Sequence, residues 1–270
     1  MFEPLAAKNP LVSQLRRLSR RRSARLTDGQ FLVEGATLLA VALDAGAEVS
    51  LVIRDGGVPL SDELAELAQR AARAGARLVE LAPGTMAKVT DTVTPQPLAS
   101  VVSRRQITLD ELLAAGPPAL PVVVLVGVSD PGNAGTLLRS AEAAGASAVV
   151  FCAGCVDPFN PKTVRASAGS IFLVPVVEDV DARVALAALG DHGVERIGTV
   201  ARGGLALGDA PLGGPVAVVL GNEAHGLPEG LERVLDGVVT IPMSGRAESL
   251  NVAMAGTLMV FEAARRRAER

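Results

Sequence analysis

The stretch VVVLVGVSDPGNAGTLLRSAEAAGA, residues 122–146, joins a continuous apolar run to a helical pattern through a turn that contains Pro131 and Gly132. An apolar run without polar alternation is typical of a strand buried on both faces, as in a parallel sheet. Gly135 permits close backbone approach at the start of the helix, where free N–H groups favour an anion. Neither the G-x-G-x-x-G nor the Gly-Lys-Ser/Thr fingerprint is present, so the turn supports neither a Rossmann site nor a P-loop.

Apolar runs of strand length recur after this stretch, and helical patterns separate them. The runs are SAVVFC (147–152), IFLVPVV (171–177), RIGTVA (196–201), PVAVVLG (215–221) and GVVTIP (237–242). We expect helices to start near residues 133, 161, 180 and 228, and a long last helix to start near 249. Buried strands alternating with helices predict a parallel sheet covered on both faces. Ligands of such sheets bind beyond the carboxyl ends of the strands. The loops after Val128, Val200, Leu220 and Ile241 are therefore the candidate site.

The first 106 residues predict a smaller α/β domain. Strands are expected at 48–55, 77–81 and 98–104, and an amphipathic helix at 61–76 with Ser61 as its N-cap. The segment AAGPPALP (114–121) contains three prolines and a glycine, which interrupt any periodicity. We predict a first domain over residues 1–106, a linker over 107–121 and a second domain over 122–270.

The composition is that of an ordinary globular protein. Of the 270 residues, 49% are hydrophobic and 20% charged, which is not the composition of a disordered chain. No stretch resembles a signal peptide and no apolar run reaches the roughly 18 residues of a membrane span, so we expect a cytoplasmic protein without a membrane partner. Cys152 and Cys155 are interpreted as small residues that end a strand. A metal site is not expected, because only two histidines could complete one.

The net charge of −3 hides a concentration of arginine near the N-terminus. On a helix, several of these side chains would share one face and could follow the phosphates of a nucleic acid, with an affinity that falls as salt rises. A solvated helix face is the alternative interpretation. The six arginines within ten residues are Arg16, Arg17, Arg20, Arg21, Arg22 and Arg25.

Polar residues at the end of the first buried strand suggest a phosphate site. Arg139 follows Asn133 by six residues, close to two helical turns, and its planar guanidinium could clamp a phosphate beside Asn133. The alternative is that Arg139 is a solvated helix residue and Asn133 a helix cap.

Two later stretches add polar residues at strand ends. In VVLGNEAHGLP (218–228), an amide and a carboxylate follow a buried strand within a glycine-bounded turn. His225 could be an acid–base group, but nothing in the sequence positions it, and we interpret it as a surface residue. In IPMSGRAESLNVAMA (241–255), an apolar lip precedes Ser249 and Asn251 at the start of an apolar helix. The stretches contain no partnered nucleophile and no paired carboxylates, so they indicate a nucleoside pocket and a transfer reaction.

These stretches resemble a known family. DPGNAGTLLRSAEAAG (130–145), VVLGNEAHGLP and IPMSGRAESLNVAMA, in this order, are similar to the three motifs of the SpoU-type (TrmH-like) RNA ribose 2′-O-methyltransferases of the SPOUT superfamily. DPFNPKTVRASAGSIFLVPVV (157–177) resembles the stretch between motifs one and two in the ribosomal-RNA branch, which includes the thiostrepton-resistance methyltransferases. RRSARLTDGQFLVEG (21–35) resembles the start of that branch's substrate-binding domain, which is like ribosomal protein L30e. The resemblance covers about residues 13–268.

The resemblance implies an α/β protein with a small L30e-like N-terminal domain and a C-terminal parallel-sheet SPOUT domain that contains a deep trefoil knot. It implies S-adenosylmethionine as the cofactor and a homodimer formed through the C-terminal domain. The expected activity is methylation of a ribose 2′-hydroxyl in structured RNA, foremost 23S ribosomal RNA. A transfer-RNA methyltransferase, or a non-catalytic RNA-binding or ribosome-assembly protein with the same fold, is the alternative.

The resemblance also assigns catalytic roles. Arg139 would have the central role. Because a guanidinium stays protonated, we expect it to clamp a phosphate and orient the hydroxyl, while the RNA phosphate or water assists proton removal. Asn133 would position Arg139 or the ribose, and Glu223 would hold an arginine or stabilise the site. Ser249 and Asn251 would bind ligand or nucleotide.

Binding roles follow from the same motif positions. Gly221 would leave room for the cofactor, and Ile241 and Leu250 would enclose its adenine. The full predicted cofactor set is Thr199, Leu220, Gly221, Ile241, Met243 and Leu250. The predicted RNA contacts are the six N-terminal arginines and Arg165.

Overall fold

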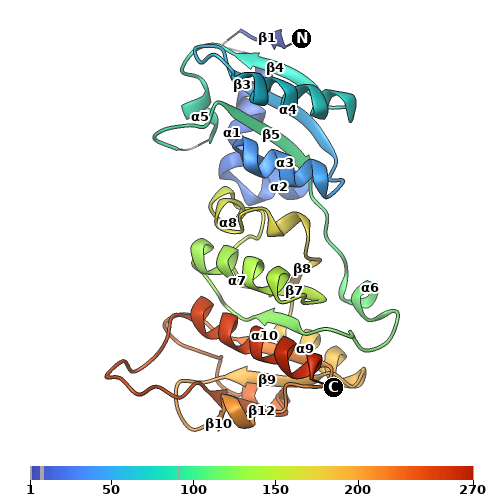
Figure 1. Ribbon diagram of the computed structural model, residues 1–270, viewed down its shortest axis with the longest axis vertical. Coiled ribbons are helices and arrows are strands. Elements are labelled where there is room, and N and C mark those ends of the chain that lie inside the picture. The colour runs from blue at the N-terminus through green and yellow to red at the C-terminus, as the bar shows by residue number, and fades with distance from the viewer. Residues whose placement is uncertain (1, 7–8, 91, 270) are drawn as a thin grey trace. The chain divides into compact units, whose positions relative to one another are not determined.

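The structure, a computed structural model, describes residues 2–6, 9–90 and 92–269 (Figure 1). Its contacts divide the chain into two compact units. Unit 1 comprises Met1–Arg105 and Phe159–Phe172, and unit 2 comprises Gln106–Pro158 and Leu173–Arg270. The predicted division into 1–106, 107–121 and 122–270 differs from this in two respects. Residues 107–121 lie within unit 2 and contain a helix, and the segment 159–172 lies in unit 1.

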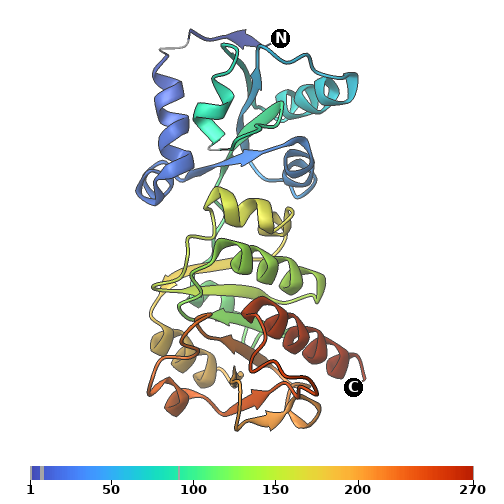
Figure 2. The same cartoon turned by 90° about the vertical axis from the view of Figure 1, so that its left-hand side faces the viewer.

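Unit 1 is built on a sheet in the order β1-β4-β3-β5-β2, with helices on both faces (Figure 2). Helices α1 and α5 cover one face and contribute Val12, Leu15 and Leu18, with Met86 and Val89, to its core. The predicted N-cap is confirmed, since the Ser61 hydroxyl accepts a hydrogen bond from Leu64 N. The strands are β1 (Glu3–Pro4), β2 (Gln30–Glu34), β3 (Val49–Asp55), β4 (Arg77–Leu81) and β5 (Leu98–Ser103). The helices of residues 1–105 are α1 (Pro10–Arg20), α2 (Arg22–Asp28), α3 (Ala36–Asp44), α4 (Asp62–Arg73) and α5 (Met86–Thr90).

The segment 159–172 completes unit 1 with α8 (Pro161–Ala166) and the 3-10 helix η1 (Ser170–Phe172). The Phe31 ring lies 5.0 Å from that of Phe159 and 6.0 Å from that of Phe172, which it stacks on. These aromatic contacts explain why part of the apolar run 171–177 does not form the predicted strand. Its first residues are buried as a 3-10 turn, and the strand begins only after Pro175, which has no N–H to donate.

Unit 2 contains a seven-stranded sheet in the order β10-β12-β9-β11-β6-β7-β8, and every neighbouring pair is parallel. The predicted fold class, a parallel-sheet C-terminal domain preceded by a smaller α/β domain, is confirmed. The strands are β6 (Val122–Leu125), β7 (Ala148–Cys152), β8 (Val176–Val180), β9 (Glu195–Thr199), β10 (Leu205–Ala206), β11 (Val216–Leu220) and β12 (Gly237–Thr240). The helices are α6 (Leu109–Leu113), α7 (Pro131–Ala143), α9 (Ala182–Asp191), η2 (Leu207–Asp209), η3 (Leu231–Val234) and α10 (Val252–Ala268).

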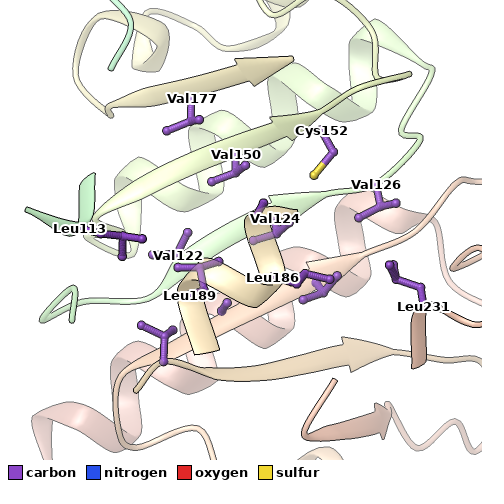
Figure 3. Packing of buried hydrophobic residues seen from close by; sticks show 14 residues of the cluster. Leu113, Val122, Val124, Val126, Val150, Cys152, Val177, Leu186, Leu189 and Leu231 are labelled. Carbon is purple, nitrogen blue, oxygen red and sulfur yellow. The ribbon is translucent and has the colours of Figure 1, made fainter. Parts of the chain in front are cut away.

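The sheet of unit 2 has a packed core on each face. Alternate residues of β6 meet Leu186 and Leu189 of α9 in a valine- and leucine-rich cluster (Figure 3). On the other face lie α7 and α10 (Figure 2). A Cβ on Gly256 would come within 2.4 Å of Leu137 and 2.5 Å of Leu220, so the glycine lets α10 approach both. Each buried leucine contributes about 1.5–3 kcal/mol of hydrophobic stabilisation.

Two predicted helix starts need correction. The helix expected near 228 is only the 3-10 turn η3, and the last helix begins at Val252 rather than near 249. The Asn251 side chain caps α10 by accepting from Ala253 N at 2.9 Å and Met254 N at 3.3 Å. Asn251 is therefore the N-cap of α10. The trefoil knot stays a prediction of the resemblance.

Candidate active site

A cavity of about 840 Å³ opens in unit 2 beyond the carboxyl ends of β9, β11 and β12. Three of the four loops that the sequence indicated, those after Val200, Leu220 and Ile241, contribute to its wall. Its lining combines apolar side chains with a few polar ones, as is usual for sites that bind small molecules. The predicted cofactor residues that line it are Thr199, Gly221, Ile241, Met243 and Leu250.

For two of the predicted cofactor residues, the structure shows a packing constraint that the sequence interpretation did not include. Leu220 is fully buried, and its side chain packs beside Gly256 instead of lining the cavity. Gly221 does line the cavity, but a Cβ there would come within 2.2 Å of the Gly226 carbonyl carbon. The close approach of its own turn, closed by hydrogen bonds between Asn222 and Gly226, therefore requires the glycine.

Glu223 accepts hydrogen bonds from the loop that starts α7. Its Oε1 accepts from Asp130 N at 2.9 Å and from Asn133 Nδ2 at 3.1 Å. Its Oε2 accepts from Ser129 N at 3.2 Å, Ser129 Oγ at 3.1 Å and Asn222 Nδ2 at 3.3 Å. The carboxylate thus joins the loops after β6 and β11, and its partners are amides and a hydroxyl rather than the arginine that the sequence suggested.

These donors change the acidity of Glu223. Partial burial raises its pKa, but the hydrogen bonds from Asp130 N, Asn133 and Ser129 N outweigh burial and lower the pKa to about 2. The group is ionised at neutral pH and its lone pairs are engaged. Glu223 therefore stabilises the loops and is a poor proton acceptor.

Asn133 connects this carboxylate to the last helix. Since a carboxylate only accepts, the Asn133 amide nitrogen faces Glu223, and its oxygen accepts from Asn251 Nδ2 at 2.9 Å. The Asn251 oxygen in turn caps α10. The helix cap of α7 is Asp130, whose carboxylate accepts from Asn133 N at 2.8 Å, so Asn133 is not a cap. The three motifs are thus joined by a hydrogen-bonded chain with fixed amide orientations.

The remaining predicted catalytic residues lie at the surface of unit 2. Arg139 is exposed on α7, and within the described ranges no hydrogen bond or ion pair engages it. Asn133 therefore does not hold Arg139 directly. Ser249 is exposed and lines the cavity next to Leu250.

The sequence interpretation included the Asn222 amide in the polar turn but gave it no specific role and missed its effect on His225. Asn222 Nδ2 donates to Gly127 O at 2.7 Å, and its Oδ1 accepts from Ala224 N at 2.9 Å and lies 3.1 Å from His225 Nδ1. An asparagine that starts a tight glycine-closed turn is a recognisable signal for such side-chain-to-backbone bonds. His225 lines the cavity.

The N-terminal arginines of unit 1 divide into two groups. Arg16, Arg17, Arg20 and Arg21 are exposed and Arg22 is half-buried. Arg25 is only 3% exposed, because α1 ends at Arg20 and α2 turns its guanidinium onto the carbonyls of Leu18 and Ser19. The prediction that Arg25 contacts RNA is therefore wrong, since its side chain joins the two helices.

Arg165 also has an internal partner. Its Nη1 lies 3.3 Å from the carboxylate of Glu34, which is buried and also accepts from Thr92 Oγ1 and Gln96 N. The side chain remains 36% exposed, so part of the guanidinium is open to solvent.

The cysteines are not arranged as a reactive pair. Burial raises the pKa of Cys152 to about 12 and also raises that of Cys155, which donates to Leu125 O. In the part of the chain that the structure describes, no group of three His, Cys, Asp or Glu side chains could hold a metal ion. No helix among the described residues is long and apolar enough to cross a membrane.

Comparisons with known proteins converge on one family. Residues 121–261 match the SpoU rRNA Methylase family, and residues 9–100 match the MRM3-like substrate binding domain. The chain is 32% identical to the 23S rRNA (guanosine(2553)-2′-O)-methyltransferase RlmP of Bacillus subtilis, over 95% of this chain and 96% of RlmP. It is 30% identical to the 23S rRNA (uridine(2479)-2′-O)-methyltransferase of Streptomyces viridochromogenes, over 97% and 92% of the two chains. An AdoMet-bound rRNA methyltransferase from Sinorhizobium meliloti has a similar structure, with a TM-score of 0.86, 30% identity and 98% of both chains covered.

Proposed function

The chain belongs to the SpoU rRNA methylase family, and we propose that it methylates a ribose 2′-hydroxyl of 23S ribosomal RNA. It is an RNA 2′-O-ribose methyltransferase that uses S-adenosylmethionine. The observation that carries the proposal for the site is the hydrogen-bonded chain Glu223–Asn133–Asn251 at the edge of the cavity. It brings all three motifs to one place, although they are far apart in the sequence.

The cavity fits the cofactor in size and lining. Ile241 and Leu250 supply apolar surface for the adenine, and Met243 extends it. The loop after β11 presents backbone groups to the cavity at Gly221, because the close packing of the turn leaves no room for a side chain there. When bound, S-adenosylmethionine supplies a methyl group activated by a sulfonium. Side chains of the site hold the ribose 2′-hydroxyl that receives this methyl group.

Asn133 and Asn251 orient the ribose in this proposal. Asn133 Oδ1 accepts a hydrogen bond from Asn251 Nδ2. The Glu223 carboxylate fixes the orientation of the Asn133 amide, because it accepts from Asn133 Nδ2. The remaining donor and acceptor of these amides are positioned for hydroxyl groups, and holding reactants in place supplies a large part of such a rate. Ser249 adds a hydroxyl from the cavity wall.

Arg139 clamps a phosphate of the RNA. Its guanidinium is exposed and no described side chain neutralises it, so it is available to an incoming anion. A planar guanidinium binds phosphate in a bidentate manner, which orients the RNA strand and also neutralises the phosphate charge. This supports a role in orienting the target nucleotide.

Unit 1 binds the RNA backbone. Arg16, Arg17, Arg20 and Arg21 place four exposed arginines on α1 and at its end, and the open part of Arg165 adds a fifth cation in the same unit. Phosphate contacts by such groups are independent of base sequence and weaken with salt. We also propose that the protein acts in the cytoplasm, because its substrate is ribosomal RNA.

The active form is a homodimer through α10. Met254 is 54% exposed, and Leu258 and Phe261 are each 45% exposed. Their spacing of four and three residues puts them on one face of the helix. A large apolar stripe of this kind is typical of a protein interface. Leu250, which lines the cavity, is also 40% exposed, so a partner on this stripe would lie next to the site.

A substitution at Arg139 tests the proposed function. Arg139→Ala should abolish methyl transfer to ribosomal RNA while cofactor affinity, measured by calorimetry, stays within about twofold. Arg233→Ala is the matched control, because Arg233 is exposed in unit 2 and lies outside the cavity and the network. Full activity of Arg139→Ala would rule out the assigned site.

A further inference from the structure

The network around Asn222 fixes the orientation of its side-chain amide. Asn222 Nδ2 lies 2.7 Å from Gly127 O and 3.3 Å from Glu223 Oε2, and both of these oxygens can only accept. The opposite atom, Oδ1, receives the N–H groups of Ala224 and His225 at 2.9 and 3.1 Å. Both sides of the amide therefore require the same orientation, with the oxygen toward the turn.

This orientation selects the tautomer of His225. Its Nδ1 lies 3.1 Å from Asn222 Oδ1, which is an acceptor, so Nδ1 must carry the hydrogen. In the neutral ring, Nε2 then has the lone pair. The imidazole is exposed, lines the cavity and is held at Nδ1. A base that is oriented by a second group is the usual arrangement for proton abstraction.

The other acidic or basic groups of the cavity wall are poorly suited to take a proton. Glu223 is occupied by five hydrogen-bond donors. Glu248 lies 3.8 Å from the guanidinium of Arg202, and Glu232 is an exposed carboxylate on η3. An ordinary carboxylate is a weak base at neutral pH. The chain's second histidine, His192, caps α9 and does not line the cavity.

We propose that His225 is the proton acceptor for the methylated hydroxyl. The inference rests on the proposed function. The 2′-O–H bond breaks as the proton passes to Nε2, and the oxygen's electron pair forms the bond to the methyl carbon. The bond from that carbon to the sulfonium sulfur breaks, and its electron pair stays on sulfur. The imidazolium then returns its proton to water, which restores the ring for the next turnover.

The tautomer can be measured without any reaction. In the ¹⁵N NMR spectrum of the full chain, the unprotonated nitrogen of a neutral imidazole resonates well downfield of the protonated one. Only two histidines are present, and the His192→Gln variant assigns them. We expect a protonated Nδ1 and an unprotonated Nε2 for His225. The opposite tautomer would overturn the proposal.

The catalytic role is tested by His225→Gln, with His192→Gln as the control. We expect the single-turnover rate of His225→Gln to fall about 100-fold, the lower end of the range for general base catalysis. Cofactor affinity by calorimetry and RNA affinity by filter binding should stay within about twofold. A rate within twofold of wild type, or a loss confined to cofactor affinity, refutes the role of His225. A wild-type protein that transfers no methyl group refutes the proposed function instead.

Discussion

Replacing Glu223 with glutamine tests how the three motifs are held together. The carboxylate accepts from two backbone N–H groups, two side-chain amides and a hydroxyl. Glutamine replaces one acceptor oxygen with an NH₂ group, so on either side at least one backbone N–H faces another donor. An NH₂ group in place of Oε1 would also face Asn133 Nδ2, and if Asn133 rotated its amide to avoid this contact, its own NH₂ would meet Asn251 Nδ2. Asn251 could then rotate only by giving up the cap of α10.

The pKa of Glu223 gives the size of the effect. A pKa that falls from 4.5 in the unfolded chain to about 2 corresponds to about 3 kcal/mol at neutral pH. Because the side chain is exposed, solvent screening reduces this to about 1–2 kcal/mol. A depressed pKa stabilises the folded state above pH 4.5, and this stabilisation is lost as the pH falls from 4.5 toward 2. The difference in free energy of unfolding between wild type and Glu223→Gln should therefore decrease as the pH falls from 4.5 toward 2.

Urea unfolding and single-turnover kinetics measure the two consequences. At pH 7, Glu223→Gln should unfold with a free energy about 1–2 kcal/mol lower than wild type. Its methyl-transfer rate should fall about 10–100-fold, because Asn133 loses its fixed orientation. Glu229→Gln is the control, since Glu229 is exposed on the same loop and no described residue bonds to it. Equal stability and rate in Glu223→Gln and Glu229→Gln would refute the reasoning.

Three further predictions concern the apolar stripe of α10, the buried Arg25 and the exposed arginines of α1. The double substitution of Met254 and Leu258 by glutamate should convert a dimer to monomers in light scattering, and an unchanged mass would exclude the α10 interface. Arg25→Met should lower the free energy of unfolding by about 1–3 kcal/mol, since two carbonyl groups lose their donor. An unaffected urea midpoint would show that this contact does not stabilise unit 1. Replacing Arg16 and Arg17 with glutamine should flatten the salt dependence of RNA binding by about 1–2 in the log–log slope. The same slope as wild type would remove them from the RNA surface.

The sheet of unit 2 is largely predictable because buried parallel strands leave continuous apolar runs. The runs at 122–128, 147–152, 215–221 and 237–242 all contain strands of the structure. The strand predicted over 171–177 does not form in its first residues, because Phe172 stacks on Phe31. Such a long-range aromatic contact cannot be recognised from local periodicity. The prediction that Arg25 contacts RNA fails for a similar reason. The break between α1 and α2 turns it inward, and the arginine spacing alone does not reveal that break.

The site is predictable in its loops but not in its connections. The strand ends identify where polar residues gather, and three of the four predicted loops line the cavity. The bonds Glu223–Asn133 and Asn133–Asn251 join residues 90 and 118 positions apart, so no spacing rule could indicate them. The case of Leu220 shows a further limit. The sequence identifies the correct loop, but only the structure shows that this side chain points into the core.

Methyl transfer from S-adenosylmethionine with a labelled methyl group tests the central claim most directly. The protein is incubated separately with 16S ribosomal RNA, 23S ribosomal RNA and transfer RNA, and the labelled RNA is digested and mapped. We predict label in 23S ribosomal RNA, on the 2′-oxygen of one ribose, and none after Arg139→Ala. Label on a base, or no transfer to any RNA, would contradict the account.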